Sequence, residues 1–328
     1  MEQEELKWRQ RAKEEWLKHG DRNTKYFHAC ATQRKMRNLI KQIVDEGGAH
    51  CNTAETIEGA FVRFYEDLFT TASTENVEIC TAAIDSKVTT LMNNNLLAEF
   101  TNEEVKNALD QMTPTKAPGP NGFNAGFYQQ HWDIVGPEVC EAALYFFKNA
   151  CMDGSINSTD IALIPKTKNS VSVTEFRPIS LCNVLYKIIS KILANRLKEI
   201  LPSIISPYQS VFLPGRLITD NILAAYKTMH SMHTKMWSKV GFMGIKLDIS
   251  KAYNRVEWNF IKAVMCKMGF APRWIKLVME CIRTVTYSIV VNGNPVGHII
   301  PSRGLRQGDP LSPYLFIICA EALSAMLT

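Results

Sequence analysis

The stretch GFMGIKLDISKAYNRVEW, residues 241–258, carries the pattern from which the fold is first predicted. Its first seven residues hold four apolar side chains and one lysine, and a short run of this kind predicts a buried strand. Asp248 follows directly, and a carboxylate there costs free energy unless a cation or a divalent metal lies beside it. Ser250 can cap a helix whose apolar side chains recur at helical spacing. The pattern predicts strand, acid and helix, with Asp248 either a metal ligand or a strand-end turn residue.

A second stretch, PSRGLRQGDPLSPYLF at residues 301–316, favours the metal-ligand interpretation. Together the two stretches resemble the palm of reverse transcriptases, and they are most similar to the polymerase region of non-LTR (LINE-type) retroelements, those of plants in particular. The resemblance implies an α+β fold shaped like a right hand, with fingers and a partial palm in which helices flank an antiparallel sheet. It divides the chain into a helical N-terminal extension at residues 1–95, a fingers-like region at 96–240 and the partial palm at 241–328.

The composition is that of a globular protein. The 328 residues are 46% hydrophobic and 21% charged, and the net charge of +5 permits a polyanionic partner without proving one. Nine cysteines occur without a CxxC pair, so we interpret them as reduced, mostly buried small hydrophobes. No apolar run has the length of a membrane span and no targeting signal is found, so we expect an intracellular protein. The resemblance adds the nucleus as one location to test.

A basic helix is predicted in the N-terminal extension, within TKYFHACATQRKMRNLIK. Its Lys25, Arg34, Lys35, Arg37 and Lys41 share the segment with aromatic side chains, a pattern that could follow a nucleic-acid backbone and stack bases. From charge alone, a solvated face of an amphipathic helix is the simpler explanation. The segment WLKHGDRNTKYFH resembles the region that precedes the polymerase core in plant LINE-type proteins, and this resemblance favours nucleic-acid binding.

The fingers-like region contains a loop rich in proline and glycine, TKAPGPNGFNAGFY. Lys116 in this loop, among exposed backbone amides, could meet a phosphate or a template strand, and a simple turn is the alternative. Members of the resembled family read KAPGPDG here. Asn121 stands in place of the expected aspartate. Asparagine also favours turns, but it is neutral, so a role of this loop that depends on the aspartate charge is in doubt.

Three further cations of the fingers-like region are candidates for substrate contact. LIPK followed by FRPISL resembles the family's fingers motif, which implies that Lys166 and Arg177 bind the triphosphate of an incoming nucleotide. Arginine suits this work because its planar fork binds phosphate bidentately. By residue type alone, each of these cations is a solvated surface charge. Arg216 matches the family pattern QxxFxxGRxxxDN, and we interpret it as structural bracing or as a template contact.

The partial palm should supply the rest of the nucleotide site. Tyr253 matches the position where the family's aromatic side chain crowds a ribose 2′-hydroxyl and so favours deoxynucleotides, and core packing is the alternative. Gln307 and Gly308 match the Gln-Gly pair that lines the family's nucleotide pocket. Arg306 beside them is a candidate contact to template or primer phosphate.

Local signals predict several helices and strands around these motifs. We expect helices at 54–69, 101–112, about 136–153, 181–201 and 271–285, a strand at 161–164, a hairpin turning at 292–294 and a helix start at Asp309.

The resemblance implies nucleotidyl transfer, and no P-loop, GxSxG or HExxH pattern points elsewhere. Two divalent metals would activate a primer hydroxyl and stabilise the leaving pyrophosphate. Magnesium is favoured because the candidate ligands, the carboxylate of Asp248 and the backbone carbonyl of Ile249, are oxygens. The implied partners are an RNA template, a DNA primer and deoxynucleoside triphosphates.

The family's third palm motif, an aromatic residue, any residue and two consecutive aspartates, does not occur before Thr328. We therefore expect a chain truncated before that motif, in which the second metal lacks an anchor. We predict that this polypeptide alone does not extend a primer. The leading function is that of an RNA-directed DNA polymerase domain of a LINE-type element, and the alternative is a non-catalytic nucleic-acid-binding remnant of a retroelement protein.

Overall fold

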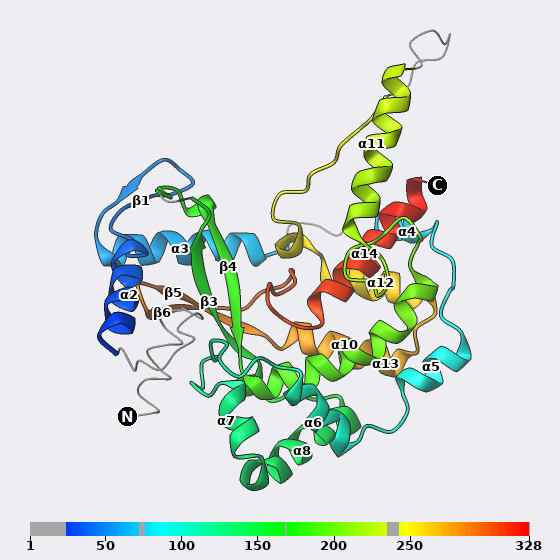
Figure 1. The fold of residues 1–328 in the computed structure, drawn as a ribbon, viewed down its shortest axis with the longest axis horizontal. Coiled ribbons are helices and arrows are strands. Elements are labelled where there is room, and N and C mark those ends of the chain that lie inside the picture. The colour runs from blue at the N-terminus through cyan, green and yellow to red at the C-terminus, as the bar shows by residue number, and fades with distance from the viewer. Residues whose placement is uncertain (1–23, 72–75, 168, 235–242, 328) are drawn as a thin grey trace.

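A computed structural model describes residues 24–71, 76–167, 169–234 and 243–327 of the chain (Figure 1). Its helices are α2 Thr24–Arg37, α3 Ala54–Phe69, α4 Val77–Thr81, α5 Thr90–Leu96, α6 Asn102–Asp110, α7 Ala125–Gln130, α8 Trp132–Asn149, α9 Gly154–Asn157, α10 Val184–Ile204, α11 Ile218–Thr234, α12 Trp258–Met268, α13 Pro272–Arg283 and α14 Ser312–Leu327, with 3-10 turns η1 Val173–Glu175 and η2 Ala252–Arg255. Its strands are β1 Ile43–Val44, β2 His50–Cys51, β3 Ser158–Pro165, β4 Phe176–Cys182, β5 Thr286–Val291 and β6 Asn294–Ile299. None of the helices within these described residues is long and apolar enough to cross a membrane.

The main sheet has four strands in the order β4-β3-β5-β6. The β3–β4 and β5–β6 pairs are antiparallel, whereas β3 and β5 run parallel with Ser158 opposite Thr286. The expected α+β class is confirmed. The sheet itself is mixed and not antiparallel throughout, because its two hairpins come from distant parts of the chain and meet along β3 and β5.

The β5–β6 hairpin turns at Asn292 and Gly293, as predicted. Both residues have positive φ, 53° and 97°, which a two-residue turn of type I′ requires and which asparagine and glycine tolerate best. The turn also holds the N-terminal part of the chain, because the Asn292 side chain accepts a hydrogen bond from the Ile40 amide and donates one to its carbonyl.

Helix starts follow their local signals. Thr101 and Glu104 form the capping box predicted for α6, with each side chain bonded to the other residue's backbone amide. Helix α3 has the predicted bounds and begins with a capping box between Thr53 and Thr56. One cluster of buried apolar side chains then joins the sheet to α3, α10, α12, α13 and α14, and Trp274 is among its fully buried members.

Several predicted bounds need correction. The helix predicted at about 136–153 is α8, which spans Trp132–Asn149, and the strand predicted at 161–164 extends over residues 158–165. Ser250 does not cap a helix, because a 3-10 turn follows it and α12 begins only at Trp258.

The predicted helix 181–201 begins only at Val184, because Leu181 and Cys182 belong to β4 and pair with β3. The FRPISLC segment is therefore a strand, which was not predicted. Helix α14 begins at Ser312 and not at Asp309, whose side chain instead accepts hydrogen bonds from the Leu311 amide and the Ser312 hydroxyl.

The strand predicted at residues 241–247 is wrong in its described part. Met243 to Ile249 is extended but belongs to no strand, and the side chains of Met243, Ile245 and Leu247 are exposed. Gly241 and Phe242 lie outside the described residues. An extended segment becomes a strand only where a neighbour satisfies its backbone groups, and no described strand pairs with this one.

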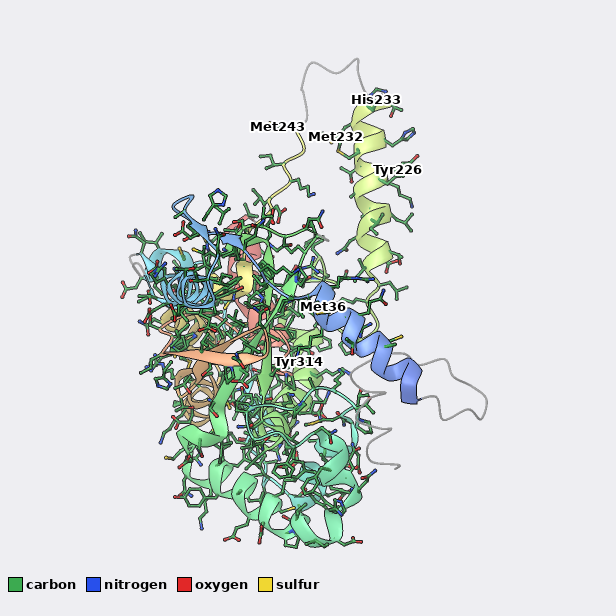
Figure 2. All side chains as sticks on the ribbon, turned by 90° about the vertical axis from the view of Figure 1, so that its left-hand side faces the viewer. Met36, Tyr226, Met232, His233, Met243 and Tyr314 are labelled. Atoms are coloured by element: carbon green, nitrogen blue, oxygen red, sulfur yellow. The ribbon has the colours of Figure 1, made fainter. Side chains whose placement is uncertain are left out.

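Helix α11 also stands apart from the body of the molecule. None of its described side chains is buried, and a Cβ added at Gly244 of the 243–249 segment would lie 3.4 Å from the Met229 sulfur of this helix. Figure 2 shows Tyr226 and His233 along the projecting helix, with Met243 on the neighbouring segment.

Candidate functional site

A pocket of about 420 Å³ brings together the two stretches that define the site. It is lined by Lys251 to Asn254 from the first stretch, by Arg306 to Gly308 from the second, and by Phe212 and Pro313. The predicted proximity of Tyr253 to the Gln307–Gly308 pair is therefore present in the structure.

Tyr253 is fixed on one side by α14. Its ring stacks on Phe316 with centroids 4.5 Å apart and planes at 12°. Its backbone carbonyl accepts a 2.7 Å hydrogen bond from the Leu305 amide, which joins the first stretch to the second. Burial raises the pKa of the Tyr253 phenol, so the ring is neutral across the physiological range.

The Gln307–Gly308 turn rests on strand β4. The Ser180 amide donates a 2.9 Å hydrogen bond to the Gln307 carbonyl, and the Gln307 side chain is left exposed. Gly308 has φ +111°, and a Cβ there would lie 3.2 Å from the Ser180 carbonyl oxygen. A residue with a side chain would strain this close approach, so glycine is required for the turn to sit on the strand.

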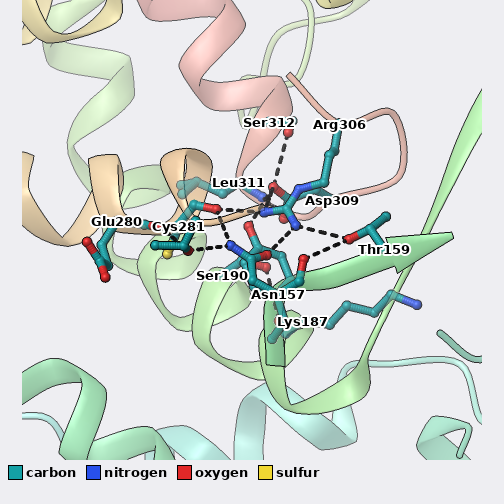
Figure 3. Close-up of polar contacts among 12 residues, drawn as sticks. Asn157, Thr159, Lys187, Ser190, Glu280, Cys281, Arg306, Asp309, Leu311 and Ser312 are labelled. Atoms are coloured by element: carbon teal, nitrogen blue, oxygen red, sulfur yellow. Dashed lines mark hydrogen bonds and ion pairs between the residues drawn. The ribbon is translucent and has the colours of Figure 1, made fainter. Parts of the chain in front are cut away.

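Arg306 is buried, and its predicted contact with template or primer phosphate is wrong. The side chain is 4% exposed and donates hydrogen bonds to Asn157, to Thr159 at 3.4 Å and to the Cys281 carbonyl at 2.8 Å. Its guanidinium also lies 3.8 Å from the Tyr186 ring centroid. Both terminal nitrogens of the guanidinium are therefore bonded to protein groups, as Figure 3 shows.

Asp309 completes this buried network from the other end of the turn. Its carboxylate lies 3.8 Å from the Arg306 guanidinium and accepts a 3.0 Å hydrogen bond from the Tyr186 hydroxyl. Burial would lower the pKa of Arg306, but the groups around it, Asp309 among them, more than offset this and keep the guanidinium charged. Sequence reasoning missed Asn157 and Tyr186, because nothing in their local pattern marks them as partners of a distant arginine.

Arg216 braces the segment after α10. Its guanidinium donates to the carbonyls of Ser206 and Gln209, both at 2.6 Å, and reaches those of Pro202 and Ile205 at 3.3 and 3.4 Å. These contacts favour the bracing interpretation. The template contact is not supported, because the donors that would meet a phosphate already meet carbonyls.

Lys166 and Arg177 lie at the loop end of the β3–β4 hairpin and are exposed. Arg177 stands opposite Ile164 in the strand pair, one residue from the end of the ladder. The Lys166 ammonium donates a 3.0 Å hydrogen bond to the Thr174 carbonyl. Both side chains can be approached from solvent, as a triphosphate contact needs.

The basic helix α2 carries Arg34, Lys35 and Arg37, all exposed, in its last turns. Lys25 lies in the first turn, and its side chain is outside the described part of the structure. A polar cleft of about 320 Å³ separates residues 37–42 from the tip of the β3–β4 hairpin.

The loop that holds Lys116 packs against the start of α10. A Cβ on Gly119 would lie 2.4 Å from the Asn183 nitrogen, so this glycine allows the loop backbone to touch the helix. The Asn121 amide donates a 3.1 Å hydrogen bond to the Asn183 side chain. Asn121 therefore serves the loop's attachment through its backbone, and Lys116 remains exposed.

Asp248 lies in the exposed extended segment and does not line the pocket that begins three residues later. The carboxylate and the neighbouring Ile249 carbonyl are oxygen donors of the kind that Mg²⁺ prefers. No group of three or more His, Cys, Asp or Glu side chains in the described residues could hold a metal.

Comparison with known proteins identifies the family. The family model described as "Reverse transcriptase (RNA-dependent DNA polymerase)" matches residues 164–328, which is half of the chain. The chain therefore belongs to the reverse transcriptase family, whose members generally use Mg²⁺.

Its relatives place it among the non-LTR retrotransposon members of that family. It is 26% identical over 94% of its length to the "Transposon TX1 uncharacterized 149 kDa protein" of Xenopus laevis. It is 25% identical over 92% of its length to the "RNA-directed DNA polymerase from mobile element jockey" of Drosophila melanogaster. Over 64% of its length it is 30% identical to the Pol polyprotein of the type-2 retrotransposable element R2DM of the same fly. These alignments cover only 23%, 32% and 19% of the three relatives.

Proposed function

We propose that the chain forms part of an RNA-directed DNA polymerase of a non-LTR retroelement, with deoxynucleoside triphosphates, an RNA template and a DNA primer as substrates. The observation that carries the proposal is the shared pocket, where Tyr253 and the Gln307–Gly308 turn come together from motifs about 50 residues apart. The name of the jockey relative, an RNA-directed DNA polymerase, supports the same activity.

In this proposal the pocket binds the sugar and base of the incoming nucleotide. The Tyr253 ring, fixed by its stack on Phe316, would stand against the ribose and exclude a 2′-hydroxyl. The exposed Gln307 side chain and the close backbone at Gly308 would form the opposite wall. Lys166 and Arg177 would meet the triphosphate, where positive charge stabilises the leaving pyrophosphate.

Asp248 and the Ile249 carbonyl would hold Mg²⁺ together with the nucleotide phosphates. Bound there, the ion would supply charge stabilisation and lower the pKa of an attacking hydroxyl. The division into an N-terminal extension, fingers-like region and partial palm belongs to the same proposal, as does nucleic-acid binding by α2 and by Lys116.

A nucleotide-binding measurement tests the proposal without requiring turnover. We expect a fluorescent deoxynucleoside triphosphate to bind the chain in the presence of Mg²⁺, and Gln307→Ala to weaken binding about tenfold, as expected for a lost contact of about 1.4 kcal/mol. Gln130→Ala is a matched control, because Gln130 is also exposed and lies outside the pocket. Equal affinity in wild type and Gln307→Ala would contradict the assignment.

The alternative is a non-catalytic nucleic-acid-binding protein of the same ancestry. The exposed position of Asp248, outside the residues that line the pocket, favours this candidate. Primer extension on an RNA template separates the two. Extension that Asp248→Ala abolishes supports the polymerase, whereas RNA retention without nucleotide binding supports the alternative.

A further inference from the structure

Three lysines lie in a row on helix α10. Lys187, Lys191 and Lys198 are four and seven residues apart, so they fall within about 40° of one another on the helix surface and span about 16 Å along its axis. The buried side chains Val184, Ile188, Ala194 and Leu201 border this narrow strip on its two sides. We call the three residues the lysine stripe.

The lysine stripe has no acidic partner in the described residues. None of the ion pairs or hydrogen bonds found there uses any of the three ammonium groups. Glu199 follows Lys198 but lies about 100° further round the helix. Asp309 is near enough to raise the pKa of Lys187, yet its carboxylate is already bonded to the Tyr186 and Ser312 hydroxyls.

A fourth cation approaches from the loop tied to the start of α10. Lys116 lies close enough to contribute to lowering the pKa of both Lys187 and Lys191, after burial in each case. The contacts of Gly119 and Asn121 with Asn183 hold this loop against the helix. Like charges so arranged repel one another, and a polyanion would relieve the repulsion.

The lysine stripe begins beside the proposed nucleotide site. Strand β4 supports the Gln307–Gly308 turn through Ser180 and runs directly into α10 at Val184. Tyr186, next to Lys187, is bonded to Asp309 at the end of the same turn. A strand that leaves the pocket along α10 would therefore pass the three lysines in succession.

We propose that the lysine stripe, together with Lys116, binds the phosphodiester backbone of a single nucleic-acid strand. At a rise of about 3.4 Å per nucleotide, its length of about 16 Å covers roughly five nucleotides. Lysine contacts of this kind neutralise phosphates without reading sequence, so the site should be sequence-independent. That the strand continues into the nucleotide pocket rests on the proposed function, whereas the binding itself does not.

The test compares two triple variants of the whole chain. In K187Q/K191Q/K198Q the stripe is removed, and in K262Q/K267Q/K276Q three exposed lysines of α12 and α13 are changed, so that both lose three charges. Fluorescence anisotropy with labelled 12-nucleotide single strands of RNA and of DNA, in EDTA and over a range of salt, gives the affinity and its salt dependence. EDTA removes any contribution of metal at Asp248, so failure of the polymerase assignment would not affect the result.

We expect the stripe variant to bind at least tenfold more weakly at low salt, with a log–log salt slope smaller by about two, since each phosphate contact contributes about 0.7 on a single strand. The control triple should keep the wild-type slope. If the stripe variant loses affinity for both oligonucleotides, the stripe binds RNA and DNA alike. If it loses affinity for only one of them, the stripe binds that kind of strand. Equal slopes in the two triples would overturn the proposal. If circular dichroism shows that the stripe triple is unfolded, Lys191→Gln alone should reduce the slope by about 0.7, and no reduction would be equally contradictory.

Discussion

Arg306 and Asp309 face each other across the Gln307–Gly308 turn, with the guanidinium and carboxylate 3.8 Å apart and both side chains buried. Each is further bonded to other elements, Arg306 to Cys281 in α13 and Asp309 to Tyr186 in α10. The two residues therefore hold both ends of the turn, while Gln307 between them stays exposed at the pocket. In the GLRQGDPLSP motif, Arg306 and Asp309 are therefore buried and support the turn, whereas Gln307 is accessible at the pocket.

Removing Arg306 should destabilise the fold strongly. Arg306→Met would leave the Asp309 carboxylate buried without its cation, and we expect the free energy of unfolding to fall by about 3–5 kcal/mol. Urea denaturation measures the change. Arg283→Met is the control: this arginine is exposed, and its change should stay within about 0.5 kcal/mol.

A double variant separates lost charge pairing from lost packing. Arg306→Met combined with Asp309→Asn leaves no unpaired charge in the network and should recover part of the lost stability. If the loss of unfolding free energy in the double variant equals the sum of the losses in the two single variants, the pair has no electrostatic coupling. The interpretation of the network would then be wrong.

Gly308→Ala should weaken the turn through backbone strain. A side chain at φ +111° costs about 1–3 kcal/mol, and the new Cβ would press on the Ser180 carbonyl. We expect lower thermal stability together with weaker nucleotide binding. Gly154→Ala serves as the control, because its Cβ would meet nothing within 4 Å and its φ is not positive. Unchanged behaviour of Gly308→Ala would show that the turn is not confined as described.

Stability should depend on pH through Asp160 on strand β3. Burial raises the pKa of its carboxyl, so the folded chain favours the protonated form. A raised carboxyl pKa contributes stability at low pH, and this contribution is lost as the pH rises through the ordinary carboxyl range and above it. Asp160→Asn should therefore be more stable than wild type at pH 7 and equally stable near pH 3, by urea denaturation. A stability difference between Asp160→Asn and wild type that grows as the pH falls would contradict this prediction.

Helix α11 should bind apolar probes. Ile222 and Tyr226 are 62% and 68% exposed on adjacent turns, next to the exposed 243–249 segment. We expect the I222Q/Y226Q variant to lower the fluorescence of a bound apolar dye such as ANS, with a change in unfolding free energy within about 0.5 kcal/mol. Thr228→Gln on the same helix should leave the dye signal unchanged. A large loss of stability in I222Q/Y226Q would mean that these side chains are packed.

Local sequence signals predicted local structure well. The capping box at Thr101, the Asn292-Gly293 turn and the bounds of α3 all follow from neighbours within a few residues, and all are confirmed. The shared pocket of Tyr253 and Gln307 was also predicted, but through family resemblance and not through local pattern.

Features that depend on distant partners were not predictable in this way. The burial of Arg306 depends on Asn157 and Tyr186, which lie more than 100 residues away in the sequence. The apolar pattern of 243–249 satisfies the rule for a buried strand, yet a strand needs a paired neighbour that the pattern itself cannot specify. The parallel pairing of β3 with β5 was missed for the same reason.

Ribose discrimination tests the central claim most directly, because it asks whether Tyr253 stands at the sugar of a bound nucleotide. The affinity of the chain for a deoxynucleoside triphosphate and for the matching ribonucleoside triphosphate would be measured with Mg²⁺, in wild type and in Tyr253→Ala. We predict that wild type binds the deoxynucleotide at least tenfold more tightly, and that Tyr253→Ala brings the two affinities within about threefold, a gap below 1 kcal/mol. A ratio that Tyr253→Ala leaves unchanged, or no nucleotide binding by wild type, would contradict the account.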